Sequence, residues 1–145
     1  MLDVPNPPFR SGRYHLSGGR PTWYGSSSEE GAWAEFARSL PEGVDPSQFR
    51  RRLGHVEFDL LVLDLTSTEL QEALGIRRAD LVSYDLAVCQ TLADLAAEAG
   101  FDAVLGPSAA TAAESTLAVF DGAIAAKATQ VRDLGGRTAS TRIKT

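Results

Sequence analysis

Five polar residues beside short apolar segments are of types that could act together in chemistry. Arg13 and Arg20 carry planar guanidinium groups, which pair with phosphate oxygens through two parallel hydrogen bonds. Glu35 carries a carboxylate that can stabilise a developing positive charge, Tyr24 has an aromatic face, and Ser108 has a hydroxyl that donates or accepts. Each residue alone is most often a surface or ion-pair residue, so only their combination indicates a site.

These residues lie within short motifs that follow one another in a fixed order. The motifs are Gly12-Arg13-Tyr14-His15, Gly18-Gly19-Arg20-Pro21-Thr22-Trp23-Tyr24-Gly25-Ser26, Ala32-Trp33-Ala34-Glu35, the stretch from Gly100 to Ala109 that contains Gly106-Pro107-Ser108, and Leu117-Ala118-Val119-Phe120. The series resembles the RES domain family, which is named for its Arg, Glu and Ser. The resemblance extends from about Gly12 to about Phe120.

The resemblance implies a fold and an activity. The implied fold is α+β, an ADP-ribosyltransferase-like mixed sheet core of the diphtheria-toxin type with flanking helices. The implied protein is the toxin of a type II toxin–antitoxin system, which depletes NAD by cleaving the nicotinamide–ribose bond through hydrolysis or phosphorolysis. A cognate Xre-type helix–turn–helix antitoxin would neutralise it in a hetero-oligomer. NAD would be a consumed substrate, with inorganic phosphate as a potential co-substrate and no cofactor or metal.

The resemblance also implies roles for individual residues. The implied catalytic residues are Arg13, Tyr24, Glu35 and Ser108. The residues implied to bind NAD are Arg13, Tyr14, Arg20, Tyr24 and Ser108, and His15 adjoins them. Breaking a glycosidic bond builds positive charge on the ribose, which a carboxylate such as Glu35 would stabilise. Arg13 and Arg20 would pair with the pyrophosphate.

Two other functions remain open from the sequence. The same donor site would serve a protein ADP-ribosyltransferase that uses NAD, because water, phosphate and protein acceptors need the same cleavage. A catalytically degenerate family member would only bind its partner. Release of nicotinamide from NAD separates the degenerate member from the other two.

Length and composition exclude several other classes. The 145 residues suit one domain (1–145), with an extended lead-in at 1–11 and a polar tail at 133–145. The net charge of -5 argues against direct nucleic-acid binding, and the Arg50-Arg51-Arg52 run is too short to reverse this. One cysteine excludes an internal disulfide, and with two histidines it does not make an ordinary zinc site. The absence of a long apolar run or signal peptide favours a cytoplasmic protein without a membrane segment.

The pattern of apolar residues predicts the elements that position the motifs. We expect a short strand at 13–16 paired with a strand at 22–24, then a helix that starts in Ser26–Glu30 through two overlapping capping boxes and runs to about Leu40. A connection would follow at 41–54. The remaining expected elements are a strand at 56–65, a short capped helix ended by Gly75, a helix with Tyr84, Val88, Leu92, Leu95 and Ala99 on its apolar face, and strands at 103–105 and 117–120.

Overall fold

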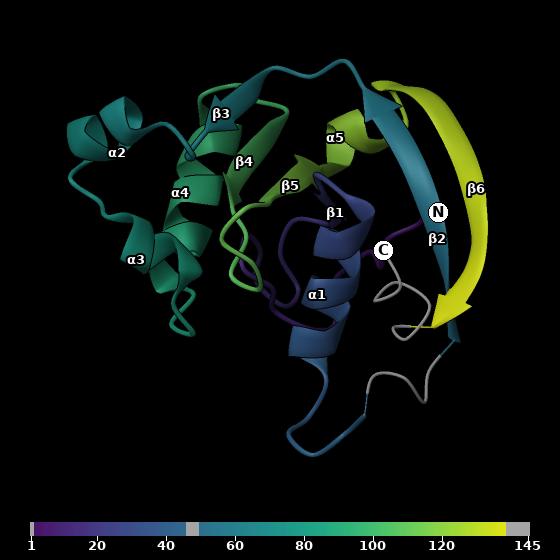
Figure 1. Ribbon diagram of the computed structural model, residues 1–145. Coiled ribbons are helices and arrows are strands. Elements are labelled where there is room, and N and C mark those ends of the chain that lie inside the picture. Colours follow the sequence, from purple (N-terminus) through teal and green to yellow (C-terminus); the bar gives the residue numbers. More distant parts are fainter. Residues whose placement is uncertain (1, 46–49, 139–145) are drawn as a thin grey trace.

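The computed structural model describes residues 2–45 and 50–138 (Figure 1). The strands are β1 (Thr22–Ser26), β2 (Arg50–Phe58), β3 (Val62–Asp64), β4 (Ala103–Pro107), β5 (Ser115–Phe120) and β6 (Ala128–Thr138). The helices are α1 (Glu29–Ser39), α2 (Thr68–Leu74), α3 (Arg78–Val82), α4 (Ala87–Glu98) and α5 (Asp121–Ile124). Residues 2–11 contain neither helix nor strand.

The main sheet has four strands in the order β1-β5-β4-β3 and mixes two kinds of pairing. β3 runs parallel to β4, whereas β1 and β5, and β5 and β4, are antiparallel. Parallel neighbours need a long crossover, and helices α2, α3 and α4 provide it between β3 and β4. A separate antiparallel ribbon joins β2 to β6. The α+β class with a mixed sheet and flanking helices is therefore confirmed.

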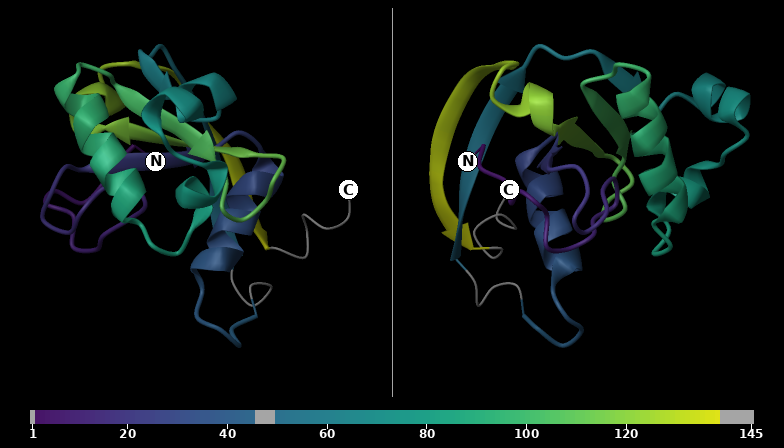
Figure 2. Two further views of the ribbon diagram at one scale, coloured as in Figure 1. Left: turned by 90° about the vertical axis from the view of Figure 1, so that its left-hand side faces the viewer. Right: turned by 180° about the vertical axis from the view of Figure 1, so that it is seen from behind.

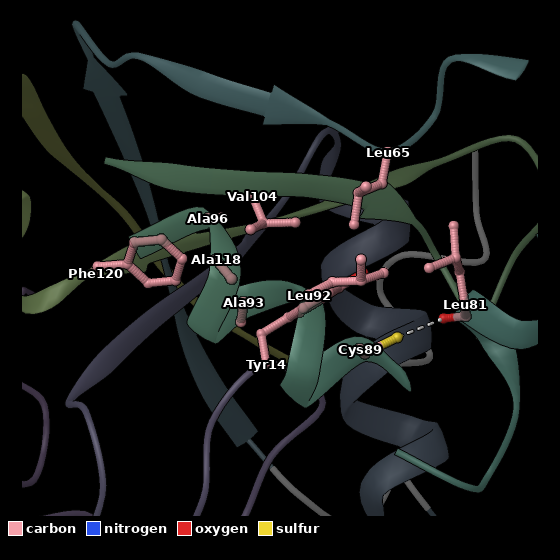
Figure 3. Close-up of a cluster of buried hydrophobic side chains, with 10 residues drawn as sticks. All are labelled: Tyr14, Leu65, Leu81, Cys89, Leu92, Ala93, Ala96, Val104, Ala118 and Phe120. Atoms are coloured by element: carbon pink, nitrogen blue, oxygen red, sulfur yellow. Dashed lines mark hydrogen bonds between the residues drawn. The ribbon is translucent and has the colours of Figure 1, made fainter. Parts of the chain in front are cut away.

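Hydrophobic clusters cover both faces of the main sheet. Successive strand residues point to opposite faces, so Val104 and Ala118 join one cluster while their neighbours Ala103 and Val119 join the other. Figure 3 shows the first cluster, in which the side chains of α4 pack on the sheet. The second cluster includes α5 and Phe58 of the ribbon. The main sheet is thus packed on both of its faces.

The ribbon and the crossover helices lie on opposite sides of the molecule, with α1 between them (Figures 1 and 2). Trp23 of β1 packs edge-on against Phe58 of β2, with ring centres 5.0 Å apart, and this contact ties the ribbon to the sheet. The arrangement leaves α1 beside the edge strand β1, where the motif residues gather.

The predicted strand at 13–16 and its pairing with 22–24 are wrong. Gly12 and His15 exchange backbone hydrogen bonds with each other, at 3.0 and 3.4 Å, so the chain turns here instead of extending. β1 pairs with β5 instead, in a register that sets Tyr24 opposite Ala118. The pairing partner lies about ninety residues away, which local sequence does not encode.

The predicted strand at 56–65 is divided between two sheets. Its first part belongs to β2 and its last to β3, and the chain crosses between them at 59–61. Hydrogen bonds fix this crossing, because Asp59 N–H donates to Lys127 O at 3.0 Å and Leu61 N–H donates to Asp102 Oδ2 at 2.8 Å. β2 also begins within the predicted connection at 41–54, of which residues 46–49 lie outside the described residues.

The predicted polar tail at 133–145 is partly wrong, because residues 133–138 belong to β6 and pair with β2; residues 139–145 lie outside the described part of the chain. The predicted apolar face of the long helix is confirmed at Leu92, which is buried, and wrong at its other large side chains. α4 begins after Tyr84, and it exposes Val88 and Leu95. Small residues let this helix pack closely on the sheet. The buried residues of α4 are Cys89, Leu92, Ala93 and Ala96.

Candidate functional site

A cleft of about 430 Å³ opens between α1, β1 and the turn at Gly12. Its lining residues are Gly12, Arg13, Tyr24, Gly25, Ser26, Ala32, Glu35, Ser39 and Thr116. Three of the four residues predicted to be catalytic, Arg13, Tyr24 and Glu35, therefore line one cleft. The fourth, Ser108, does not line the cleft but forms a hydrogen bond with Glu35, which does.

Helix α1 presents Glu35 to this cleft. Its N-cap is Ser28, whose side chain accepts a hydrogen bond from Gly31 N at 3.0 Å. The capping boxes predicted on Ser26 and Ser27 thus lie one or two residues too early. Trp33, which is buried, anchors the helix, and Glu35 lies two positions further on. Pro41 follows the end of α1, because proline cannot continue the hydrogen-bond ladder.

Ser108 holds the Glu35 carboxylate in place. Its hydroxyl donates to Glu35 Oε1 at 2.7 Å. Ser108 Oγ in turn accepts backbone N–H bonds from Ala110 at 3.1 Å and from Thr111 at 3.3 Å. Thr116 adds a longer contact to Oε1 at 3.4 Å. Ser108 is only 2% exposed, so it is a positioning residue for Glu35 in this structure rather than a lining residue. The bond joins residues 73 positions apart.

Arg13 is fixed by main-chain carbonyls on the opposite side of the cleft. Its Nη1 donates to Leu81 O at 3.1 Å and to Ser83 O at 2.8 Å, at the end of α3. A guanidinium has five N–H donors, and both bonds use one nitrogen. The other nitrogens leave donors with which Arg13 could bind an anion in the cleft.

Tyr24 is held by its hydroxyl. The hydroxyl oxygen accepts from Tyr14 N at 2.9 Å and lies 2.7 Å from His15 Nδ1, while His15 Nε2 lies 2.8 Å from Arg10 O. A carbonyl only accepts, so the proton of the neutral imidazole is on Nε2, and Tyr24 donates its own proton to Nδ1. Burial raises the pKa of Tyr24 well above its ordinary value. The Tyr24 hydroxyl therefore stays protonated, and its hydrogen bonds to Tyr14 and His15 hold it in place. The aromatic ring is then the part of Tyr24 that can stack on a substrate.

Glycine is required where the chain passes this hydroxyl. A Cβ on Gly12 would lie 2.5 Å from His15 Cε1 and 2.9 Å from Tyr24 Oη. Neither distance allows a side chain, and the Tyr24 ring forms the wall of the cleft. The glycine that precedes Arg13 in the motif thus has a steric reason.

Tyr14 and Arg20 are not brought to the cleft, so the contacts predicted between their side chains and NAD are not supported by this geometry. Tyr14 is fully buried in the core cluster, and burial raises its pKa. Arg20 pairs with Asp94 at 3.1 Å and lies 5.2 Å above the ring of Phe120, because the turn that carries it faces α4. The sequence placed both residues in the motif but could not show which way their side chains point.

Thr116 and Ser39 line the cleft and were not predicted. Thr116 lies on β5 two positions before Ala118, the residue that pairs with Tyr24 of β1. Because side chains alternate along a strand, Thr116 and Ala118 point to the same face of the sheet. Ser39 lies one turn after Glu35 on α1, which puts both on one helix face. These signals become usable only after the strand and helix bounds are known.

Neither a metal-binding cluster nor a membrane-spanning helix occurs in residues 2–45 and 50–138. There, no three or more His, Cys, Asp or Glu side chains are grouped so that they could hold a metal ion. Within the same ranges, every helix is too short or too polar to cross a membrane.

Comparisons with known proteins identify the family. A Mycobacterium tuberculosis protein named "Probable NAD(+) phosphorylase" is 48% identical over 110 residues, which cover 75% of this chain and 53% of that protein. The chain thus spans about half the length of this relative. A chain in the crystal structure of the M. tuberculosis MbcT–MbcA toxin–antitoxin complex has a TM-score of 0.65 and 23% identity, over 90% of this chain and 75% of that one, and shares its fold. The model of the RES domain matches residues 2–139, and the chain therefore belongs to the RES domain family.

Proposed function

We propose that this RES domain is the toxin of a type II toxin–antitoxin system and that it cleaves the nicotinamide–ribose bond of NAD. The observation that carries the proposal is the Glu35 carboxylate, which Ser108 fixes at 2.7 Å beside a cleft that Arg13 and Tyr24 also line. The name of the 48% identical relative, a probable NAD(+) phosphorylase, supports the same reaction.

The proposal includes an ADP-ribosyltransferase-like fold of the diphtheria-toxin type. The mixed sheet of four strands, the flanking helices and the cleft beside the edge strand support it. We treat residues 1–145 as one domain acting in the cytoplasm.

Each residue has a distinct part in the reaction. When the bond from the nicotinamide nitrogen to ribose C1 breaks, its electron pair leaves with nicotinamide and positive charge develops on the ribose. Glu35 stabilises this charge, Tyr24 stacks on the nicotinamide ring, and Arg13 binds an anionic or polar group of the substrate. Ser108 acts through Glu35.

The acceptor completes the reaction. An oxygen of inorganic phosphate forms the new bond to C1 in phosphorolysis, and a water oxygen, which loses its proton, does so in hydrolysis. The relative's name favours phosphate. Neither reaction needs a cofactor or a metal ion. A protein acceptor would use the same donor chemistry, and the enzyme would then be a protein ADP-ribosyltransferase.

The test measures nicotinamide released from NAD by the purified protein, with and without phosphate. We expect release by the wild type, faster with phosphate, and loss of at least about 100-fold in Glu35→Gln, since one electrostatic contact to a transition state is worth about 10²–10³ in rate. Glu30→Gln is the matched control, because Glu30 lies exposed on the same helix. No release by folded wild-type protein under either condition would leave the degenerate binding module as the function.

A second experiment tests the partner. We propose that a cognate Xre-type helix–turn–helix antitoxin covers the cleft in a hetero-oligomer, and that binding of nucleic acid belongs to that partner. The fold shared with a chain of a toxin–antitoxin complex and the net charge of -5, which suits a basic partner surface, support this. Expression of the chain alone should arrest growth, and co-expression of the antitoxin should restore growth and yield a complex. Growth arrest that the antitoxin does not relieve would contradict it.

A further inference from the structure

Arg38 and Tyr84 form a contact that the proposed reaction does not yet use. Arg38 Nη1 donates to Tyr84 Oη at 3.1 Å, and the guanidinium carbon lies 4.2 Å from the centre of the Tyr84 ring. Arg38 belongs to α1, and Tyr84 lies between α3 and α4. Tyr84 is 83% exposed, although large aromatic side chains are more often at least partly buried.

Neither residue of this pair lines the cleft, but each is a neighbour in the chain or on the helix of residues that line it or hold a lining residue. Arg38 follows Glu35 by three positions and precedes Ser39, so it lies about one helical turn from the catalytic carboxylate and next to a lining residue. On the other side, Tyr84 follows Ser83, whose carbonyl accepts a bond from Arg13 at 2.8 Å. Both partners are therefore connected to cleft-lining residues.

The charge of Arg38 is not neutralised by a carboxylate. Within the described part of the chain no ion pair involves Arg38, and its hydrogen bond goes to a neutral phenol. By contrast, Arg20 pairs with Asp94 at 3.1 Å. Arg13 is not paired with a carboxylate either, but two carbonyls already occupy its Nη1. The positive charge of Arg38, which lies close to cleft-lining residues and contacts only the neutral Tyr84 side chain in the interactions given above, is thus available to pair with an anion.

We infer that Arg38 and Tyr84 bind the adenosine diphosphate half of NAD, a role within the proposed function. The Arg38 guanidinium pairs with the pyrophosphate, whose oxygens match its planar fork. Tyr84 orients the guanidinium through its hydroxyl, and its exposed ring offers a stacking surface for the adenine. The family resemblance implied that Arg13 and Arg20 pair with the pyrophosphate. In this inference Arg38 replaces Arg20, because Arg20 pairs with Asp94 and does not line the cleft.

The test separates binding from cleavage. Steady-state nicotinamide release gives KM and kcat for NAD, and calorimetry gives the Kd of ADP, a probe that carries the pyrophosphate but not nicotinamide. Arg38→Gln should raise both the KM for NAD and the Kd of ADP by about 10-fold or more and change kcat by less than about threefold, as expected for a charge-assisted bond made before cleavage. Arg38→Lys should recover part of the loss, because it keeps the charge without the fork.

Tyr84 is tested by two variants. Tyr84→Phe keeps the ring but removes the acceptor of the Arg38 bond, so it should weaken ADP binding by about two- to fivefold, near the value of one hydrogen bond. Tyr84→Leu also removes the stacking surface and should weaken ADP binding further. Equal binding of ADP by the wild type and Tyr84→Leu would overturn the stacking role.

The controls are two other arginines. Arg132→Gln removes one exposed positive charge far along the ribbon, and Arg20→Gln tests the position that the sequence favoured; neither should change KM or Kd beyond twofold. The inference is overturned if Arg38→Gln binds ADP as the wild type does, or if Arg20→Gln or Arg132→Gln loses as much. If ADP binds and its binding depends on Arg38, but no nicotinamide is released from NAD, the result would support this binding site. It would contradict only the proposal that the protein cleaves NAD. Failure of both measurements in the wild type would overturn both proposals.

Discussion

The hydrogen bond from Ser108 to Glu35 gives a sharp quantitative prediction. Ser108→Ala removes a charge-assisted bond of 2.7 Å and leaves the N–H groups of Ala110 and Thr111 without the oxygen that accepts them. A hydrogen bond to a charged group is worth about 1.5–3 kcal/mol. The free energy of unfolding should therefore fall by about this amount, measured as a lower urea midpoint.

The same change should act on catalysis through the position of Glu35. A reacting group displaced by about 1 Å can cost about 100-fold in rate, so we expect kcat for nicotinamide release to fall by about 10- to 100-fold at saturating NAD. KM should change little, because Ser108 is buried behind the cleft wall and does not line it. A fall in kcat without a rise in KM identifies Ser108 as a positioning residue.

Thr116→Val is the matched control. Thr116 donates to the same Glu35 oxygen, but at 3.4 Å, close to the limit for a hydrogen bond. Its loss should cost less than about threefold in kcat, which corresponds to roughly 0.6 kcal/mol. Two results would refute the reasoning: Ser108→Ala with wild-type kcat in folded protein, or Thr116→Val with a loss equal to that of Ser108→Ala.

Two further predictions concern buried groups. Tyr14→Phe should leave stability and nicotinamide release within error of the wild type or slightly raise stability, because Tyr14 Oη is buried and the Cys89 thiol beside it is only a weak hydrogen-bond partner. A large loss in nicotinamide release would mean that the Tyr14 hydroxyl contacts NAD. Burial raises the pKa values of Cys89, Tyr14 and Tyr24, so the unfolded chain loses protons at a lower pH than the folded one. Urea midpoints should therefore fall as pH rises above about 8.5, and more steeply above about 10, and a flat profile would contradict this.

The sequence predicted the elements that carry their own start and stop signals. The helix that bears Glu35 was expected because serines and glutamates precede an apolar repeat and a proline follows, and the strands at Ala103 and Leu117 were expected from short apolar runs. Gly75 ends α2 in the left-handed conformation, at φ 69°, as the capping rule predicts. These features depend on neighbours within a few residues.

Pairing between distant strands was not predictable in this way. Periodicity shows that a segment can be a strand but not which partner it takes, so β1 was assigned to the wrong neighbour and the segment 56–65 was not divided. The long helix shows a related limit. Tyr84, Val88 and Leu95 repeat at helical spacing, yet the buried face uses small residues that a search for large apolar side chains passes over.

The choice between Arg20 and Arg38 for the pyrophosphate shows what tertiary structure adds to a motif. In the sequence, the family resemblance implies that Arg13 and Arg20 pair with the pyrophosphate, and Arg38 lies outside the motif residues to which it implies a role. The turn that carries Arg20 faces α4, however, where Asp94 and the Phe120 ring already engage the guanidinium. Arg38 looks like an ordinary helix-end cation, which favourably opposes the helix dipole. It becomes a binding candidate only because α1 places it one turn from Glu35 and the segment after α3 supplies Tyr84. The motif thus supplies one cation of the cleft, Arg13, whereas the packing of α1 against distant segments brings a second one, Arg38, close to it.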